Sequence, residues 1–199
     1  MKLGKLLFTV IGAAVLLGAL VTSASARNIR TSSVDHRATW TRMDFAGGFG
    51  TIECEVVLEG RYNETTFVKG LSFLLGYITA GNVSRCARGG MTINRGSLPW
   101  HIQYTRFTGR LPLITGLIVI FLGVEFRLRD PGTGATCNVS GATSSTIGTY
   151  TLSAGTVARA DVSGTSVCRG LFIEIEGELR GGTTNVDNKA GARITVTLI

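Results

Sequence analysis

Two histidines and one row of glutamates are the side chains of this sequence whose types and spacing could do chemistry. His36 and His101 are its only histidines, and a serine hydrolase would need one of them as its general base. His36 follows Asp35 in a polar stretch without periodicity, which is a poor platform for a positioned group. The sequence has no G-x-S-x-G turn that would present a serine to either histidine.

His101 lies in the segment 98–112, LPWHIQYTRFTGRLP. This segment alternates with period two, which predicts a β-strand. On such a strand Trp100, Ile102 and Tyr104 share the apolar face, and His101 lies on the polar one. We therefore interpret His101 as a solvent-facing histidine, with a catalytic base as the alternative.

The glutamate row consists of Glu174, Glu176 and Glu178 in LFIEIEGEL. Two carboxyl groups about 5 to 10 Å apart can cleave a glycosidic bond, and i, i+2 neighbours on a strand fit that spacing. Every amphipathic strand also produces such a row on its solvated face. We favour the solvated face, paired with arginines of a neighbouring strand such as Arg127 and Arg129.

Motifs for cofactors and metals are missing from the sequence. It contains no phosphate-binding glycine loop, dinucleotide fingerprint or zinc spacing. The segment 185–191, NVDNKAG, is only loosely similar to a calcium loop, because Lys189 stands where a ligand should be. We expect no cofactor, no metal, and no catalytic residue apart from the alternative for His101.

The N-terminus has the three parts of a secretory signal peptide. Lys2 and Lys5 precede an uncharged apolar run over residues 6–21, and Ala24 and Ala26 fit a small-residue cleavage site. We predict a signal peptide over residues 1–26 with cleavage after Ala26. The alternative is that the segment is kept as a membrane anchor.

Cysteine usage agrees with export. The four cysteines Cys54, Cys86, Cys137 and Cys168 are widely spaced, with no C-x-x-C pair. In an oxidising compartment they predict two disulfides. We favour Cys54–Cys86 and Cys137–Cys168, since each closes a loop of about thirty residues, which is worth about 3 to 4 kcal/mol.

Period-two patterns dominate the chain from residue 46 to residue 199. TIECEVVLE and RITVTLI are examples, and clusters of Gly, Ser, Thr, Asn and Asp separate such runs. We predict one all-β domain over 46–199, either an antiparallel β-sandwich or a closed β-barrel of about eight to ten strands. Residues 27–45 lack periodicity and are predicted to form a loose N-terminal segment.

The most apolar strand predicted is the one that contains Leu117 to Leu122. It is a central strand covered on both faces, or its second face meets a partner subunit, such as another copy of the chain, or lipid. The formal net charge of +7 falls to +5 without Lys2 and Lys5, and the remaining charge forms no Lys/Arg block. This excludes a nucleic-acid footprint and leaves anionic envelope polymers or lipids as partners.

The pattern LPWH-x-x-Y-x-x-F-x-G-x-LP-x-IT at 98–115 resembles uncharacterised secreted proteins of high-GC Gram-positive bacteria. The later G-x-x-F at 123–126, the four spaced cysteines and the terminal strand ending in Leu-Ile are similar as well. The resemblance covers most of the mature chain. It implies export and an all-β fold, but no activity and no functional residue.

These observations favour an exported, non-catalytic β-domain with a structural or binding role at the cell envelope or outside the cell. One alternative is a secreted hydrolase of glycans or peptides, based on His101 and the glutamate row. Another is a membrane β-barrel or pore subunit, based on the two-faced apolar strand, although such barrels alternate apolar and polar residues throughout.

Overall fold

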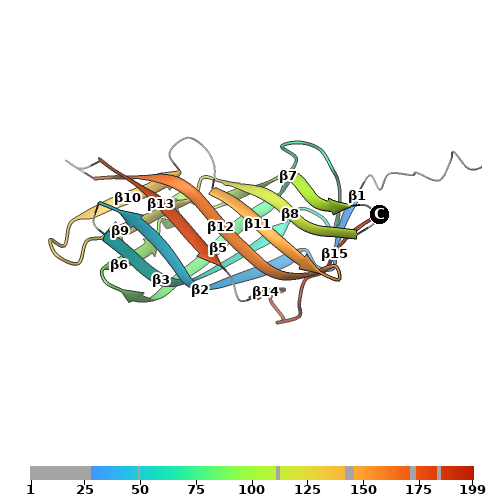
Figure 1. Cartoon of the computed structure of the whole chain (residues 1–199), viewed down its shortest axis with the longest axis horizontal. Helices are drawn as coiled ribbons and strands as arrows, with labels where there is room; N and C mark the ends of the chain where they lie inside the picture. The colour runs from blue at the N-terminus through green and yellow to red at the C-terminus, as the bar shows by residue number, and fades with distance from the viewer. Residues whose placement is uncertain (1–27, 49, 111–112, 142–145, 171–173, 183–184) are drawn as a thin grey trace, which may run out of the picture.

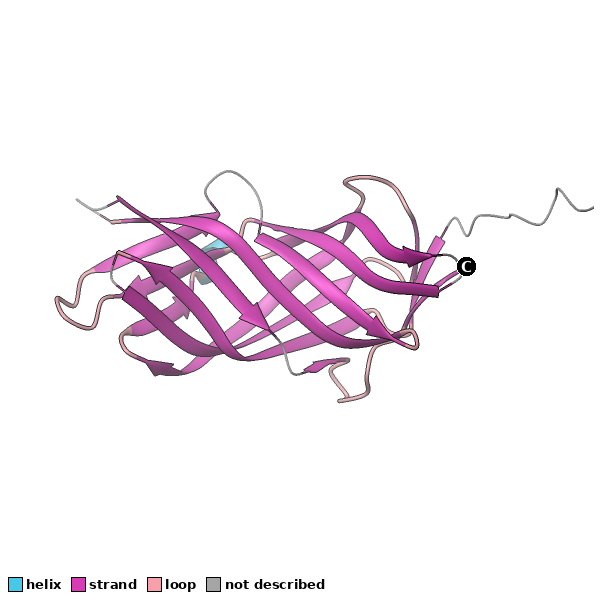
Figure 2. Cartoon of the chain, viewed as in Figure 1, coloured by secondary structure: helices cyan, strands magenta, loops and turns pink. Residues whose placement is uncertain are grey.

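The fold is seen in a computed structural model that describes residues 28–48, 50–110, 113–141, 146–170, 174–182 and 185–199. The predicted signal peptide and its cleavage after Ala26 lie outside these residues. The described chain is an elongated body built almost entirely of strands (Figures 1 and 2). No helix in this part of the chain is long and apolar enough to cross a membrane.

Eight antiparallel strands form a closed ring. The ring closes because β11 pairs with β8 along one edge and with β12 along the other. In spatial order the eight strands are β11 (Thr146–Ser153), β8 (Leu113–Leu122), β7 (Trp100–Arg110), β5 (Leu74–Ala87), β3 (Gly50–Tyr62), β2 (Asp35–Gly47), β13 (Glu174–Gly182) and β12 (Thr156–Arg169). The architecture is therefore a barrel and not a sandwich.

Shorter strands extend the barrel at its two ends (Figure 1). At one end β10 (Thr136–Gly141) pairs with the last residues of β12, and β9 (Glu125–Arg129) and β6 (Gly90–Ile93) follow. A single 3-10 turn (Arg95–Ser97) leads from β6 towards β7. At the other end β15 (Val196–Leu198), β1 (Asn28–Thr31) and β4 (Thr66–Val68) form a separate small sheet. β14 (Asn185–Asp187) pairs with β2.

The prediction of an all-β antiparallel fold is confirmed. The described residues form fifteen strands, more than the eight to ten expected. The additional strands β1, β4, β6, β14 and β15 are only three or four residues long. Alternation over so few residues does not stand out from a loop in the sequence.

The prediction of a loose segment over 27–45 is wrong, since β1 and most of β2 fall within it. The buried positions of β2 are even up to Ala38 and Trp40 and odd from Met43 and Phe45 onward. A bulge between Trp40 and Met43 causes this change of parity. The extra residue breaks the period of two, which hid the strand.

Alternation on β3 and on the first half of β7 is as expected, with one face of each strand filling the barrel. On β5 the alternation is irregular, since Leu75, Gly76 and Ile78 are buried. Trp100, Ile102 and Tyr104 are buried and His101 is exposed, as predicted. The Trp100 ring meets Phe126 edge-on with centroids 5.3 Å apart. Such contacts between large buried side chains account for most of the stabilisation of a barrel interior.

The apolar strand β8 is central in the sheet, between β7 and β11. Leu117, Val119 and Phe121 are buried in the barrel, whereas Ile118 and Ile120 on the outer face are half-buried. Both edges of the strand are hydrogen-bonded, so it offers no free edge for pairing. Self-association through its outer face stays a prediction.

Both predicted disulfides are present. Cys54–Cys86 joins β3 to β5, and Cys137–Cys168 joins β10 to β12. The sequence separations are 32 and 31 residues. Each bridge therefore crosslinks two strands and closes a loop of about thirty residues.

The two-residue connection between β5 and β6 predicts a stabilising substitution. Arg88 and Gly89 have φ of 63° and 76°, in the left-handed region, where asparagine is more favourable than arginine. We expect Arg88→Asn to raise the free energy of unfolding by about 0.5 to 1 kcal/mol, measured by urea titration. Gly89→Ala should have the opposite effect, because its Cβ would lie 2.6 Å from the Arg129 carbonyl oxygen. No change in Arg88→Asn would contradict this account of the connection.

Candidate functional site

A depression of about 500 Å³ lies on the outer surface at the barrel end that carries β6, β9 and β10. It is lined by Thr92, Ile93, Asn94, Arg127, Thr136, Cys137, Asn138, Arg169 and Gly170. Four different strands or their ends supply these residues. The depression is thus a product of the sheet and not of any one loop.

Strand register aligns the polar lining residues. Thr92 lies opposite Arg127, Arg127 opposite Asn138, and Asn138 opposite Arg169. The four face outward, because residues that precede or follow them, such as Leu128, are buried in the barrel. Adjacent strands are about 4.8 Å apart, so the Cα atoms of the two arginines lie roughly 10 Å apart with Asn138 between them.

The chemistry of this depression is cationic. Arg127 donates a hydrogen bond to Thr136 Oγ1 at 3.4 Å, and the exposed Asn138 amide adds both a donor and an acceptor. No carboxylate is among the described residues that line it, and the nearest acidic position in the sheet register is Glu174, opposite Arg169 on β13. Guanidinium groups bind phosphate and carboxylate through paired hydrogen bonds, so the arrangement suits an anion.

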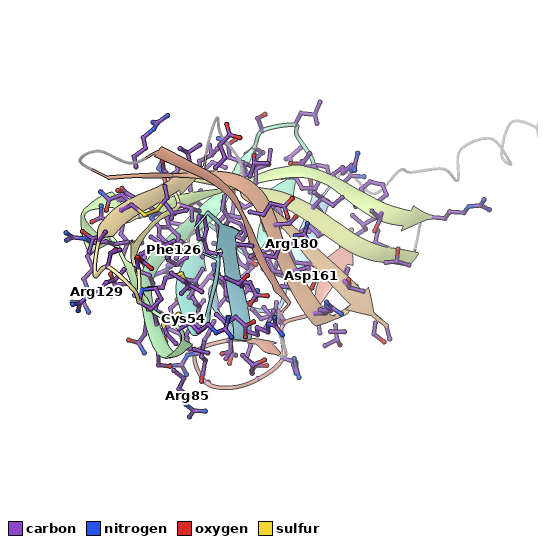
Figure 3. All side chains as sticks on the ribbon, turned by 60° about the vertical axis from the view of Figure 1, so that its left-hand side comes forward. Cys54, Arg85, Phe126, Arg129, Asp161 and Arg180 are labelled. Carbon is purple, nitrogen blue, oxygen red and sulfur yellow. A yellow bond between two sulfur atoms is a disulfide. The ribbon has the colours of Figure 1, made fainter. Side chains whose placement is uncertain are left out.

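A second depression, over β2, β12 and β13, has about 420 Å³ but a different charge balance. There Arg42 pairs with Asp44 at 3.0 Å and Arg159 with Asp161 at 2.6 Å. Asp161 and Arg180 lie on this face in Figure 3. Because acidic side chains accompany its arginines, this surface is a neutralised ionic ladder and a weaker anion site.

Further exposed arginines lie at the same end of the barrel. Arg129 faces outward one pleat beyond Arg127, and Arg85 projects from the same end (Figure 3). Arg85 pairs with Glu55 at 3.4 Å but its side chain is 84 % exposed. Such exposed cationic groups extend the positive field around the depression.

Local structure holds the depression rigid. The disulfide Cys137–Cys168 lies beneath it and fixes β10 to β12. In the turn after β9, the Asp130 carboxylate accepts hydrogen bonds from the backbone N–H groups of Gly132 and Thr133 at 3.2 and 3.0 Å. The hydrogen bond from the Thr133 hydroxyl, followed by the one from the Gly132 backbone, lowers the pKa of Asp130. The turn therefore fixes the connection between β9 and β10, the strands that carry Arg127 and Asn138.

His101 lies elsewhere, on the outer face of β7. Its backbone neighbours are Tyr77 on β5 and Leu122 on β8, and its ring meets Tyr77 edge-on with centroids 5.2 Å apart. Neither neighbour is a carboxylate that could orient the imidazole as a general base. The strands beside it thus bring no second catalytic group to His101.

The glutamate row lies on β13, between β12 and β2. Arg127 and Arg129 are on β9, which is not adjacent to β13, so the expected ladder between them and the glutamates is wrong. Glu178 pairs instead with Arg180 of its own strand. Both side chains are exposed, as on an ordinary solvated face.

The interior holds a polar cluster that the sequence analysis missed. His36 stacks on Tyr62 with centroids 4.5 Å apart, and Tyr62 and Tyr150 share a side-chain hydrogen bond. Burial raises the pKa of Tyr62 to about 12 and lowers that of His36 to about 4. Neither ring nitrogen of His36 has a hydrogen-bond partner in the described structure. The alternation of His36, Ala38 and Trp40 was the signal that could have revealed it.

No group of three or more His, Cys, Asp or Glu in the described chain is arranged to hold a metal ion. Comparison with protein-family models, curated proteins and solved structures finds no match. The fold itself defines the class: an all-β antiparallel domain with two disulfides. Such bridges persist in oxidising compartments, so the class is consistent with an extracellular protein.

Proposed function

We propose that this protein is an exported, non-catalytic β-barrel domain that binds anionic polymers of the cell envelope. The observation that carries the proposal is the pair Arg127 and Arg169, which flank Asn138 in a depression without a lining carboxylate among the described residues. Export is supported by the two disulfides and by the signal-peptide pattern of residues 1–26.

A polymer suits this surface better than a small anion. The depression is shallow and lies on the outside of the barrel, and its two arginines are separated by roughly two strand spacings, or 10 Å. Repeated phosphate or carboxylate groups along a chain can contact both guanidinium groups, and Arg129 next to them. Simultaneous contacts raise the affinity without a deep pocket.

The double variant Arg127→Gln/Arg169→Gln tests the proposal. We expect it to bind sodium polyphosphate at least a hundredfold more weakly than the unsubstituted protein, because two charge-assisted contacts of about 1.5 to 3 kcal/mol each are lost. The measurement is a calorimetric titration at low ionic strength, repeated at increasing salt. Neutral dextran should not bind to either protein.

The matched control is Arg37→Gln/Arg193→Gln. It removes the same charge from exposed positions near β14, away from the depression. We expect its polyphosphate affinity to fall by less than twofold. Equal weakening in the two double variants would show attraction by net charge alone and overturn the assignment of the site, as would unchanged binding in Arg127→Gln/Arg169→Gln.

A further inference from the structure

The exposed large apolar side chains of the described chain are Val68, Leu71 and Ile199, which are 59 %, 83 % and 51 % exposed. All three lie at the barrel end opposite the arginine-lined depression. This is the end with the small sheet of β1, β4 and β15 (Figure 1). The rest of the described surface exposes no apolar side chain of this size to a similar extent.

Backbone pairing brings the three residues together. Asn28 of β1 lies opposite Val68 of β4, and on its other side it exchanges two backbone hydrogen bonds of 3.0 Å with Ile199. Leu71 follows in the tight turn after Val68, closed by a hydrogen bond from the Gly70 N–H to the Val68 carbonyl oxygen at 2.9 Å. The sheet therefore holds the apolar side chains at one tip of the molecule.

Basic side chains surround this tip. Lys69 lies between Val68 and Leu71 in sequence, with its Nζ 5.1 Å from the centroid of the Phe107 ring. Arg106 and Arg110 are exposed on the same strand as Phe107, which ends at this tip. Arg30 faces outward from β1. Apolar side chains ringed by cations are the pattern of a surface that contacts anionic lipids.

The described chain also begins at this tip. Asn28 is the first described residue, and it lies between Val68 and Ile199. The apolar run of residues 6–21 therefore precedes this tip in the sequence. During export, a membrane-inserted signal peptide would bring this end of the barrel, and not the other, against the bilayer.

We propose that this tip, defined by Val68, Lys69, Leu71, Arg110 and Ile199, docks on the surface of an anionic lipid bilayer. The apolar side chains enter the headgroup region and the basic ones contact lipid phosphates. A second copy of the chain is a poorer occupant, because a symmetric contact would place each cluster of cations against its own image.

A tryptophan substituted for Leu71 reports contact with lipid directly. We expect Leu71→Trp to show a blue-shifted emission with phosphatidylglycerol vesicles, and quenching by brominated acyl chains. Pro131→Trp, in the exposed turn at the opposite end of the barrel, is the matched control and should show neither effect. The comparison is valid for the exported protein with or without residues 1–26, because it measures which end of the barrel contacts the bilayer.

The basic residues of the tip are tested separately, by measuring binding to lipid vesicles. Lys69→Gln/Arg110→Gln should weaken binding to phosphatidylglycerol vesicles about thirtyfold, since each basic residue near an anionic surface is worth about 1 kcal/mol. Arg37→Gln/Arg193→Gln loses the same charge away from the tip and should change binding by less than threefold. Phosphatidylcholine vesicles should bind all these proteins weakly.

Several outcomes would overturn the proposal. Absence of a shift in Leu71→Trp, or equal quenching of the introduced tryptophan in Leu71→Trp and Pro131→Trp, would show that this end does not face the lipid. A blue shift that grows with protein concentration without vesicles would assign the tip to a second copy of the chain. The proposal concerns residues at the other end from Arg127 and Arg169, so it stands or falls separately from polymer binding.

Discussion

At pH 4 the protein is expected to be about 3 kcal/mol less stable to unfolding than at pH 7 through His36 alone. The imidazole is buried in the barrel, and the loss of hydration on burial lowers its pKa from 6.5 to about 4. Neither ring nitrogen has a hydrogen-bond partner in the described structure that would stabilise the protonated form. The folded protein therefore keeps this histidine neutral.

The sign follows from the two pKa values. Above pH 6.5 the histidine is neutral in both the folded and the unfolded state, so it does not lower the free energy of unfolding. As the pH falls from 6.5 to 4, the unfolded chain takes up a proton that the folded chain does not bind, so unfolding becomes more favourable. Below pH 4 both states are protonated and the loss no longer grows.

Neighbouring charges oppose each other at this site. Asp35 raises the pKa of His36 and Lys189 lowers it, both less than burial does. Asp35 and Lys189 are themselves 3.9 Å apart. The stacked Tyr62 stays neutral across the range, since burial raises its pKa to about 12. The loss of stability in acid should therefore reflect mainly the burial of His36.

The measurement is urea unfolding between pH 7 and pH 4 for the unsubstituted protein and for His36→Leu. The variant keeps every carboxylate and loses the buried base, so the difference between the two pH slopes isolates the histidine. Its slope should be flatter. A ¹H–¹³C NMR titration of the His36 ring gives an independent check, and a ring that titrates near 6.5 would contradict the burial argument.

Loss of either disulfide is the second large effect. Cys54→Ala/Cys86→Ala and Cys137→Ala/Cys168→Ala are each expected to lower the free energy of unfolding by about 3 to 4 kcal/mol, because the unfolded chain regains the entropy of an open loop. The loops span 32 and 31 residues, so the two losses should be similar. Urea titration of each variant against the oxidised protein measures them. A loss below about 1 kcal/mol would contradict the loop-entropy account.

The same two variants differ in their expected effect on binding. Cys137 lines the arginine-lined depression, and its bridge fixes β10 to β12 beneath Asn138. Cys54–Cys86 joins β3 to β5 instead. At a urea-free condition where both variants are folded, polyphosphate affinity should fall in Cys137→Ala/Cys168→Ala and stay unchanged in Cys54→Ala/Cys86→Ala. Equal affinities would show that the bridge stabilises the fold without positioning the site.

Local periodicity was sufficient for the class of fold and for many buried faces. Side chains alternate between the two faces of a strand, so the pattern around Trp100 predicted which residues are buried and put His101 on the surface. The disulfide pairing followed from sequence spacing, since the nearer cysteines close the shorter loops. Where alternation broke, at the bulge after Trp40, the prediction failed and β2 was missed along with the buried His36.

What only the tertiary structure decided is which distant strands lie side by side. Closure of the barrel depends on β11 pairing with both β8 and β12. The depression depends on the registers of β9, β10 and β12, which bring Arg127 and Arg169 to the two sides of Asn138. Strand register is set by the packing of the whole core and by loop geometry, and a shift of one residue would turn these arginines inward. The sequence by itself thus determined a disulfide-bonded β-domain and many of its polar and apolar faces. The surface proposed to bind anions exists only once non-local strand pairing has aligned its residues.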